Sequence, residues 1–197
     1  MNIPTKEECY ALLEKYKAPI SIVDHVTAVA KVGRQLAEAF VAKGQDVNVE
    51  AVEAACLLHD VLKCVDFNNY NNFNEEEQAF YQDLIEKFGK GHPEAAEKML
   101  TEEGYPEIGL IVRSHGLESI GEANGPISTA QKIVFYADKR AKYATIPLEK
   151  RFSEWKKKYS EKDDSRDTEY WAEKEKLTIA LEEDLFEQLD ISPGDLK

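Results

Sequence analysis

The stretch Ala54-Ala55-Cys56-Leu57-Leu58-His59-Asp60-Val61-Leu62-Lys63 decides how the rest of the chain is interpreted. Its small and aliphatic residues are typical of a helix that neighbours contact on several faces. An imidazole and a carboxylate then stand side by side. Lys63 follows three residues after Asp60 and shares its face if the helix runs to about Lys63. Burying these groups unpaired is costly. The stretch is therefore either a reactive centre or a core histidine with an aspartate partner at a solvated helix end.

Composition limits the class of protein. The chain has 197 residues, enough for a full core, and we expect one domain over 1–197. Its formal net charge of −13 argues against binding to nucleic acid or to an anionic membrane surface. No apolar run approaches the roughly 20 residues of a membrane span, and no signal peptide is visible. Cys9, Cys56 and Cys64 form no C-x-x-C pair, so we expect reduced thiols and a cytoplasmic protein.

Capping residues and helix breakers predict an all-α fold. Thr5, Asn48 and Ser128 or Thr129 are suitable N-caps, and Gly44 ends a long helix. The pattern predicts helices over about 5–17, 20–43, 48–63 and 75–88. It predicts three more: one begins at His92-Pro93-Glu94, the next ends at His115, and the third begins at Ser128 or Thr129. Nothing convincingly predicts a strand.

Two segments lie outside this helical pattern. Residues 66–74 are polar, aromatic and rich in asparagine, and predict an irregular loop that is either a substrate wall or a surface connection. The core is expected over about 18–146, followed by packing helices over about 147–190 with a charged hinge at 161–169. Trp155 and Trp171 are expected to anchor those helices.

The candidate site residues fall on helix ends or inner faces. Each of the four histidines taken alone is more simply a packed histidine, but all of them form one ordered series with two aspartates. The set is His25, His59, Asp60, His92, His115 and Asp138. Imidazole and carboxylate ligands suit Mn, Fe, Co, Ni or Zn. Six groups exceed the need of one tetrahedral ion and can serve one or two ions. Asp60 is the natural bridge, because it directly follows a ligand.

The series resembles the HD-domain metal-dependent phosphohydrolase superfamily. The family pattern H…HD…D is carried here by His25, His59-Asp60 and Asp138, and the two histidines that the two-metal branches add match His92 and His115. The resemblance covers roughly residues 20–145 and implies an HD-domain helical bundle with additional C-terminal helices. The HD pair continues here as Val61-Leu62-Lys63, whereas small bacterial members often continue it as H-D-I-G.

The resemblance implies a metal-dependent phosphohydrolase. Such an enzyme cleaves a phosphate ester or phosphoanhydride of a small nucleotide-like substrate with a metal-activated water. Asp60 and Lys63 are the expected catalytic residues: Asp60 orients the water, and Lys63 either binds a phosphate oxygen or is a solvated lysine. Arg113 and Arg140 could also reach the site.

Three further possibilities remain open. The lysine three residues after Asp60 is similar to branches that cleave dinucleoside tetraphosphates or cyclic dinucleotides. Another branch with the same ligands is a di-iron oxygenase. The third possibility is a non-catalytic module that binds a nucleotide or a metal. Neither the oligomeric state nor the metal is predicted.

Overall fold

The structure is a computed structural model that describes residues 1–160 and 167–197. Over these residues it is helical, with one isolated β-bridge between Ala141 and Thr145 and no strand, so the predicted all-α class is confirmed. The α-helices are α1 (Lys6–Lys15), α2 (Ile20–Ala42), α3 (Val49–Leu58), α4 (Glu75–Phe88), α5 (His92–Glu102), α6 (Pro106–Val112), α7 (Thr129–Arg140), α8 (Leu148–Ser160) and α9 (Thr168–Phe186). Short 3-10 helices are η1 (Lys63–Asp66), η2 (Leu117–Ser119) and η3 (Pro193–Asp195).

Side-chain caps set the start of several helices. Thr5, Asn48 and Ser128 each accept a hydrogen bond from the amide three residues further along the chain. Each cap satisfies one of the amides that a helix leaves unpaired at its N-terminus. The predicted starts of α1, α3 and α7 are therefore confirmed.

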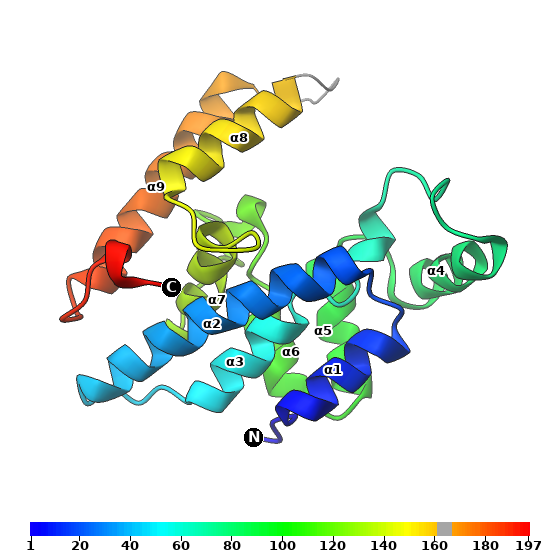
Figure 1. Cartoon of the computed structure of the whole chain (residues 1–197), viewed down its shortest axis with the longest axis horizontal. Helices are drawn as coiled ribbons and strands as arrows, with labels where there is room; N and C mark the ends of the chain where they lie inside the picture. Colours follow the sequence, from blue (N-terminus) through cyan, green and yellow to red (C-terminus); the bar gives the residue numbers. More distant parts are fainter. Residues whose placement is uncertain (161–166) are drawn as a thin grey trace.

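Helix α3 lies in the centre of the core, covered by α2 along its length (Figure 1). Ala54, Ala55, Leu57 and Leu58 are all buried. The two helices approach closely because Gly33 of α2 lacks a side chain: a Cβ there would clash with Sγ of Cys56. This packing holds the end of α3, where His59 follows, in a fixed place against α2.

The predicted end of α3 at about Lys63 is wrong, since the helix stops at Leu58. The amide of Val61 bonds to the carbonyl of Leu58, and the amide of Lys63 bonds to the carbonyl of Asp60. These bonds span three residues rather than four, so the chain tightens into turns and then into η1. His59 and Asp60 thus lie on turns after the helix rather than on one helical face.

The loop over 66–74 is held by aromatic packing. Phe67 stacks on Phe73 with ring centroids 5.8 Å apart, and Tyr81 of α4 contacts both rings. The Tyr70 hydroxyl donates to the carbonyl of Cys64 at 2.8 Å. None of the loop residues is among the described residues that line the cavity above the candidate site. Of the two predicted roles, the structure supports a surface connection, which the aromatic side chains pack against α4.

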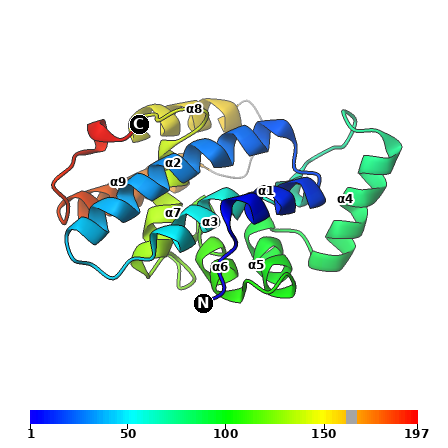
Figure 2. The same ribbon diagram turned by 60° about the horizontal axis from the view of Figure 1, so that its bottom comes forward.

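Helices α8 and α9 form an antiparallel pair beside α7, on the side of the molecule opposite α4 (Figures 1 and 2). Phe152 and Leu185 are buried by this packing. Most of the predicted charged hinge, residues 161–166, lies outside the described residues, and α9 begins at Thr168. In the part of the chain that the structure describes, no helix is both long enough and apolar enough to cross a membrane.

Candidate metal centre

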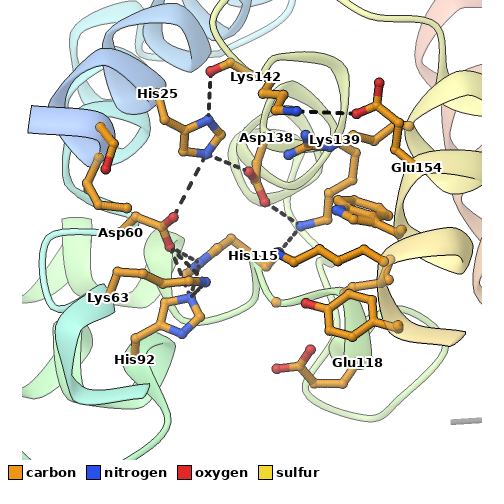
Figure 3. A pocket seen from close by; sticks show the side chains of 18 of the residues that line it. His25, Asp60, Lys63, His92, His115, Glu118, Asp138, Lys139, Lys142 and Glu154 are labelled. Carbon is orange, nitrogen blue, oxygen red and sulfur yellow. Dashed lines mark hydrogen bonds and ion pairs between the residues drawn. The ribbon is translucent and has the colours of Figure 1, made fainter. Parts of the chain in front are cut away.

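All six predicted ligands meet at one place in the core. His25 lies on α2, and His59 and Asp60 lie on the turn after α3. His92 is the first residue of α5, His115 lies on the turn after α6, and Asp138 lies on α7. Figure 3 shows five of them converging at the base of a cavity. His59 is fully buried, and Asp60 and His115 are buried. Residues far apart in sequence thus form one polar cluster inside an apolar core.

Asp60 divides this cluster into two half-sites. Its Oδ2 atom lies 3.8 Å from Nε2 of His25 and 3.7 Å from Nε2 of His59. Its Oδ1 atom lies 3.0 Å from Nε2 of His92 and 3.5 Å from Nε2 of His115. Each oxygen of one carboxylate therefore faces its own pair of imidazoles. This is the arrangement in which one carboxylate can bridge two cations.

Asp138 completes the first half-site. Its Oδ1 atom lies 3.0 Å from Nε2 of His25 and 3.5 Å from Nε2 of His59. The first half-site thus contains two imidazoles and two carboxylate oxygens, and the second contains two imidazoles and the other oxygen of Asp60. Either set has the donor types that divalent transition metals take in proteins.

All four imidazoles are oriented by their second nitrogen. In three rings Nδ1 faces a backbone carbonyl: His25 faces Lys142 at 3.1 Å, His59 faces Cys56 at 2.8 Å, and His115 faces Val112 at 2.7 Å. In the fourth ring, Nδ1 of His92 lies 2.6 Å from Oδ2 of Asp66. A carbonyl cannot donate, so Nδ1 carries the hydrogen in the three rings that face one. The Nε2 lone pair of each neutral ring then points into the cluster, as metal ligation requires.

Two buried atoms test whether a cation fits. Nε2 of His59 and Oδ1 of Asp60 make no hydrogen bond of good geometry among the described residues, although Oδ1 lies close to His92 and Lys63. A buried polar atom without a partner is costly, and these two belong to different half-sites. A cation in each half-site would satisfy both atoms, so the residues present fit a metal.

Asp66 supports His92 and was not among the predicted site residues. Its Oδ2 atom accepts from the ring and from the amide of His92, and its Oδ1 atom accepts from the amide of Gly91 at 2.8 Å. Gly91 has a φ of +84°, which points both amides toward the carboxylate. These bonds hold the pKa of Asp66 below its usual range despite partial burial. Nothing in the sequence spacing connects Asp66 to His92.

Two lysines contact the cluster. Lys63 Nζ lies 2.9 Å from Nε2 of His92 and 3.4 Å from Oδ1 of Asp60, so Lys63 lies beside the cluster although it does not share a helical face with Asp60. Lys139 is buried, and its ammonium donates to Oδ2 of Asp138 at 2.6 Å and to the carbonyl of His115. Sequence reasoning missed Lys139, although a lysine inside the run 133–140 is as unusual as the aspartate before it.

The electrostatics favour charged carboxylates and neutral imidazole at key positions. Burial opposes ionisation of Asp60, but the positive charge of Lys63 acts against it, and the pKa of Asp60 is held well below its usual range. Burial also disfavours the charged form of His115 and lowers its pKa to about 3. A neutral imidazole and an ionised carboxylate are the forms that bind a metal.

The two arginines considered from the sequence are engaged elsewhere. Arg140 donates to the carbonyls of Ile146 and Pro193, and Arg113 pairs with Glu97 at 3.4 Å. Neither lines the cavity above the cluster.

That cavity has a volume of about 720 Å³ and opens from the cluster toward α8. Lys142 and Tyr143 line it between the core and α8, and Arg151 and Trp155 line it from α8. Trp155 packs edge-on against Phe152, and Trp171 is buried against Tyr159, as expected of anchors. Both tryptophans also line the cavity, which the sequence did not predict.

Comparison with known proteins identifies the class. The family model described as the HD domain matches residues 22–143, which is more than half of the chain and includes all six clustered residues. The chain therefore belongs to the HD-domain family, a superfamily of metal-dependent hydrolases. No curated protein and no solved structure matches the chain. The matched segment ends before α8, so α8 and α9 lie outside it.

Proposed function

We propose that this protein is a metal-dependent phosphohydrolase that cleaves a phosphate ester or phosphoanhydride of a small nucleotide-like substrate. One observation carries the proposal: Asp60 presents Oδ2 to His25 and His59, and Oδ1 to His92 and His115. Such a shared carboxylate is what a centre for two divalent ions requires. The cavity directly above it is large enough for a nucleotide-sized ligand.

The ligands would divide as the half-sites do. His25, His59, Asp60 and Asp138 would hold one ion, and Asp60, His92 and His115 a second. The donor types fit Mn, Fe, Co, Ni or Zn. A divalent ion supplies an acidified water and neutralises charge on a phosphate under attack.

The chain's own residues have distinct tasks in this proposal. Asp60 holds the two half-sites in register and can accept a hydrogen bond from the attacking water. Lys63 lines the cavity beside Asp60, and its ammonium can pair with a phosphate oxygen. Lys139 is buried beneath the centre and fixes Asp138, so we assign it a positioning task.

Metal analysis combined with a phosphate-release screen tests the proposal. The full chain is loaded with Mn, Fe, Co, Ni or Zn in turn and assayed on nucleotides, dinucleoside polyphosphates and cyclic dinucleotides. We expect bound metal and phosphorus–oxygen bond cleavage with at least one metal and one substrate. Asp83→Asn, which changes an exposed carboxylate on α4, serves as the control for non-specific loss of charge.

Two results would overturn the proposal. Protein that carries two irons, consumes oxygen and cleaves no phosphate ester would be an oxygenase. Protein that binds a nucleotide and metal without any turnover would be a binding module.

A further inference from the structure

The cavity is more basic than the protein as a whole. Its described lining contains the basic residues Lys63, Lys139, Lys142, Arg151, Lys157 and Lys158 and the acidic residues Asp60, Glu118, Asp138 and Glu154. Basic side chains thus outnumber acidic ones here, although the chain carries a net charge of −13. Local positive charge in a cleft of an acidic protein favours an anionic ligand.

Three of the six basic residues in this lining pair with a described carboxylate. Lys63 and Lys139 contact Asp60 and Asp138 at the centre, and Lys142 pairs with Glu154 at 3.4 Å. Arg151 differs from them. None of the described carboxylates lies within ion-pair distance of its guanidinium, and its buried Nε atom has no hydrogen-bond partner in the described part of the chain.

Each of the other described arginines has a partner for its guanidinium, although the Nε atom of Arg140 is also buried without a hydrogen-bond partner. Arg34 pairs with Glu38 and Glu53, Arg113 pairs with Glu97, and Arg140 donates to two carbonyls. Arg151 instead lies over the ring of Trp155, with its Cζ atom 4.7 Å from the ring centroid. Stacking on an aromatic ring holds a guanidinium in place while its donors stay available at its edge.

We infer that Arg151, held on Trp155, forms an anion-binding subsite for a second phosphate of the substrate, separate from the phosphate that is cleaved at the centre. The inference rests on the proposed function and narrows its substrate class to small organic molecules with two phosphate groups. The planar guanidinium can donate two parallel hydrogen bonds to one phosphate. Because α8 lies outside the segment that matches the HD domain, this subsite belongs to the part of the chain added to the family core.

Bisphosphonates of increasing length test the inference without turnover, because their phosphorus–carbon bonds resist hydrolysis. Binding of each α,ω-alkylbisphosphonate and of the alkylphosphonate of equal length is measured by calorimetry on the metal-loaded full chain. Three proteins are compared: wild type, Arg151→Gln and Lys150→Gln. Lys150 precedes Arg151 on α8, is exposed and does not line the cavity, so its variant removes the same charge outside the subsite.

We expect at least one bisphosphonate to bind wild type and Lys150→Gln about tenfold or more tightly than its matched alkylphosphonate. Arg151→Gln should lose that advantage and keep its affinity for the alkylphosphonate. The inference is overturned if wild type shows no advantage at any length, or if Arg151→Gln keeps it. If Arg151→Gln melts below the assay temperature, Arg151→Lys replaces it. That variant should bind the bisphosphonate at least about threefold more weakly than wild type, and equal binding overturns the inference.

Phosphate release separates the two proposals. If wild type cleaves phosphate esters but Arg151→Gln still binds the bisphosphonate more tightly than the alkylphosphonate, only the second-phosphate subsite is overturned. If the tighter binding of the bisphosphonate depends on Arg151 but the protein cleaves no phosphate ester, the hydrolase proposal is overturned and the anion subsite is supported.

Discussion

The ammonium of Lys63 lies 2.9 Å from Nε2 of His92, on the side where that imidazole faces Oδ1 of Asp60. Lys63 therefore occupies the edge of the second half-site. An ammonium and a divalent cation cannot both use the lone pair of His92. We expect Lys63 to turn toward the cavity when this half-site is loaded, which would place its charge where a substrate phosphate enters.

Substitution of Lys63 should separate substrate binding from metal binding. Lys63→Ala should keep the metal, because it removes a cation that competes for His92. It should lower kcat/KM by about 10- to 150-fold, the equivalent of one charge-assisted hydrogen bond of about 1.5–3 kcal/mol. Asp60→Ala should lose both metal and turnover, because Asp60 serves both half-sites. Metal content and phosphate release are measured on both variants. Equal loss of metal in the two would contradict this division of roles.

Removal of the carboxylate behind His92 should weaken the second half-site. Asp66→Asn keeps the size of the side chain but loses the charge that holds the ring of His92. We expect metal affinity to fall about 10- to 100-fold, the usual effect of losing such a supporting carboxylate. Titration with a metal-sensitive dye measures it. Asp83→Asn is the matched control on α4, and a loss of affinity there as large as in Asp66→Asn would refute the specific role of Asp66.

The sequence was sufficient to predict the class of fold, because helix caps and periodicity are local signals. It was also sufficient to predict the six clustered residues, because their ordered series resembles the HD-domain pattern. Caps such as Asn48 and Ser128 fix helix starts through bonds within one turn. The end of α3 could not be predicted, since the turns after Leu58 depend on packing around His59. A continuous helix and a tightened turn have the same apolar pattern there.

The supporting residues depend on contacts between distant segments. Asp66 meets His92 only because η1 packs against α5, and Lys139 meets the carbonyl of His115 only because α7 lies beside the end of α6. Arg151 reaches the cavity because the α8–α9 pair packs on α7. No periodicity within one helix contains this information.

Removal of metal should lower the melting temperature. The cluster gathers polar groups in the core, and a ligand that binds only the folded state stabilises it by mass action. At a free metal concentration about 100 times the dissociation constant, the stabilisation is about 2.7 kcal/mol. Thermal denaturation of chelator-treated and metal-loaded protein measures the difference. Identical melting temperatures at saturating metal would show that the half-sites bind none of the ions tested.

The stability of the metal-free protein should depend on the protonation of His115. Burial lowers the pKa of His115 from 6.5 to about 3, so the unfolded chain takes up a proton in a range where the folded chain does not. This contribution to stability is fully present above about pH 6.5 and is lost as the pH falls toward 3. His59 opposes it, because its pKa is raised by Asp60 and Asp138 despite burial.

The difference between wild type and His115→Asn isolates this contribution. Unfolding by urea is measured from pH 7.5 to pH 4 on both metal-free proteins. Wild type should lose stability more steeply than the variant as the pH falls below about 6.5. Parallel pH profiles would mean that His115 titrates normally in the folded chain.

Lys139 should contribute more to the free energy of unfolding in the metal-free protein than in the metal-loaded protein. Its buried ammonium offsets the charge of Asp138, so Lys139→Met leaves that carboxylate without its cation partner. Breaking a buried ion pair costs about 3–5 kcal/mol, and we expect that loss of unfolding free energy in the metal-free protein. A bound ion would itself offset the charge of Asp138, so the loss should be smaller in metal-loaded protein.

Lys132→Met on the same helix removes the pair with Asp184 and should cost under about 1 kcal/mol in either state. Urea unfolding of the three proteins, with and without metal, gives both differences. An equal loss for Lys139→Met in the two states would mean that the ion does not neutralise Asp138, and that Asp138 is not a ligand.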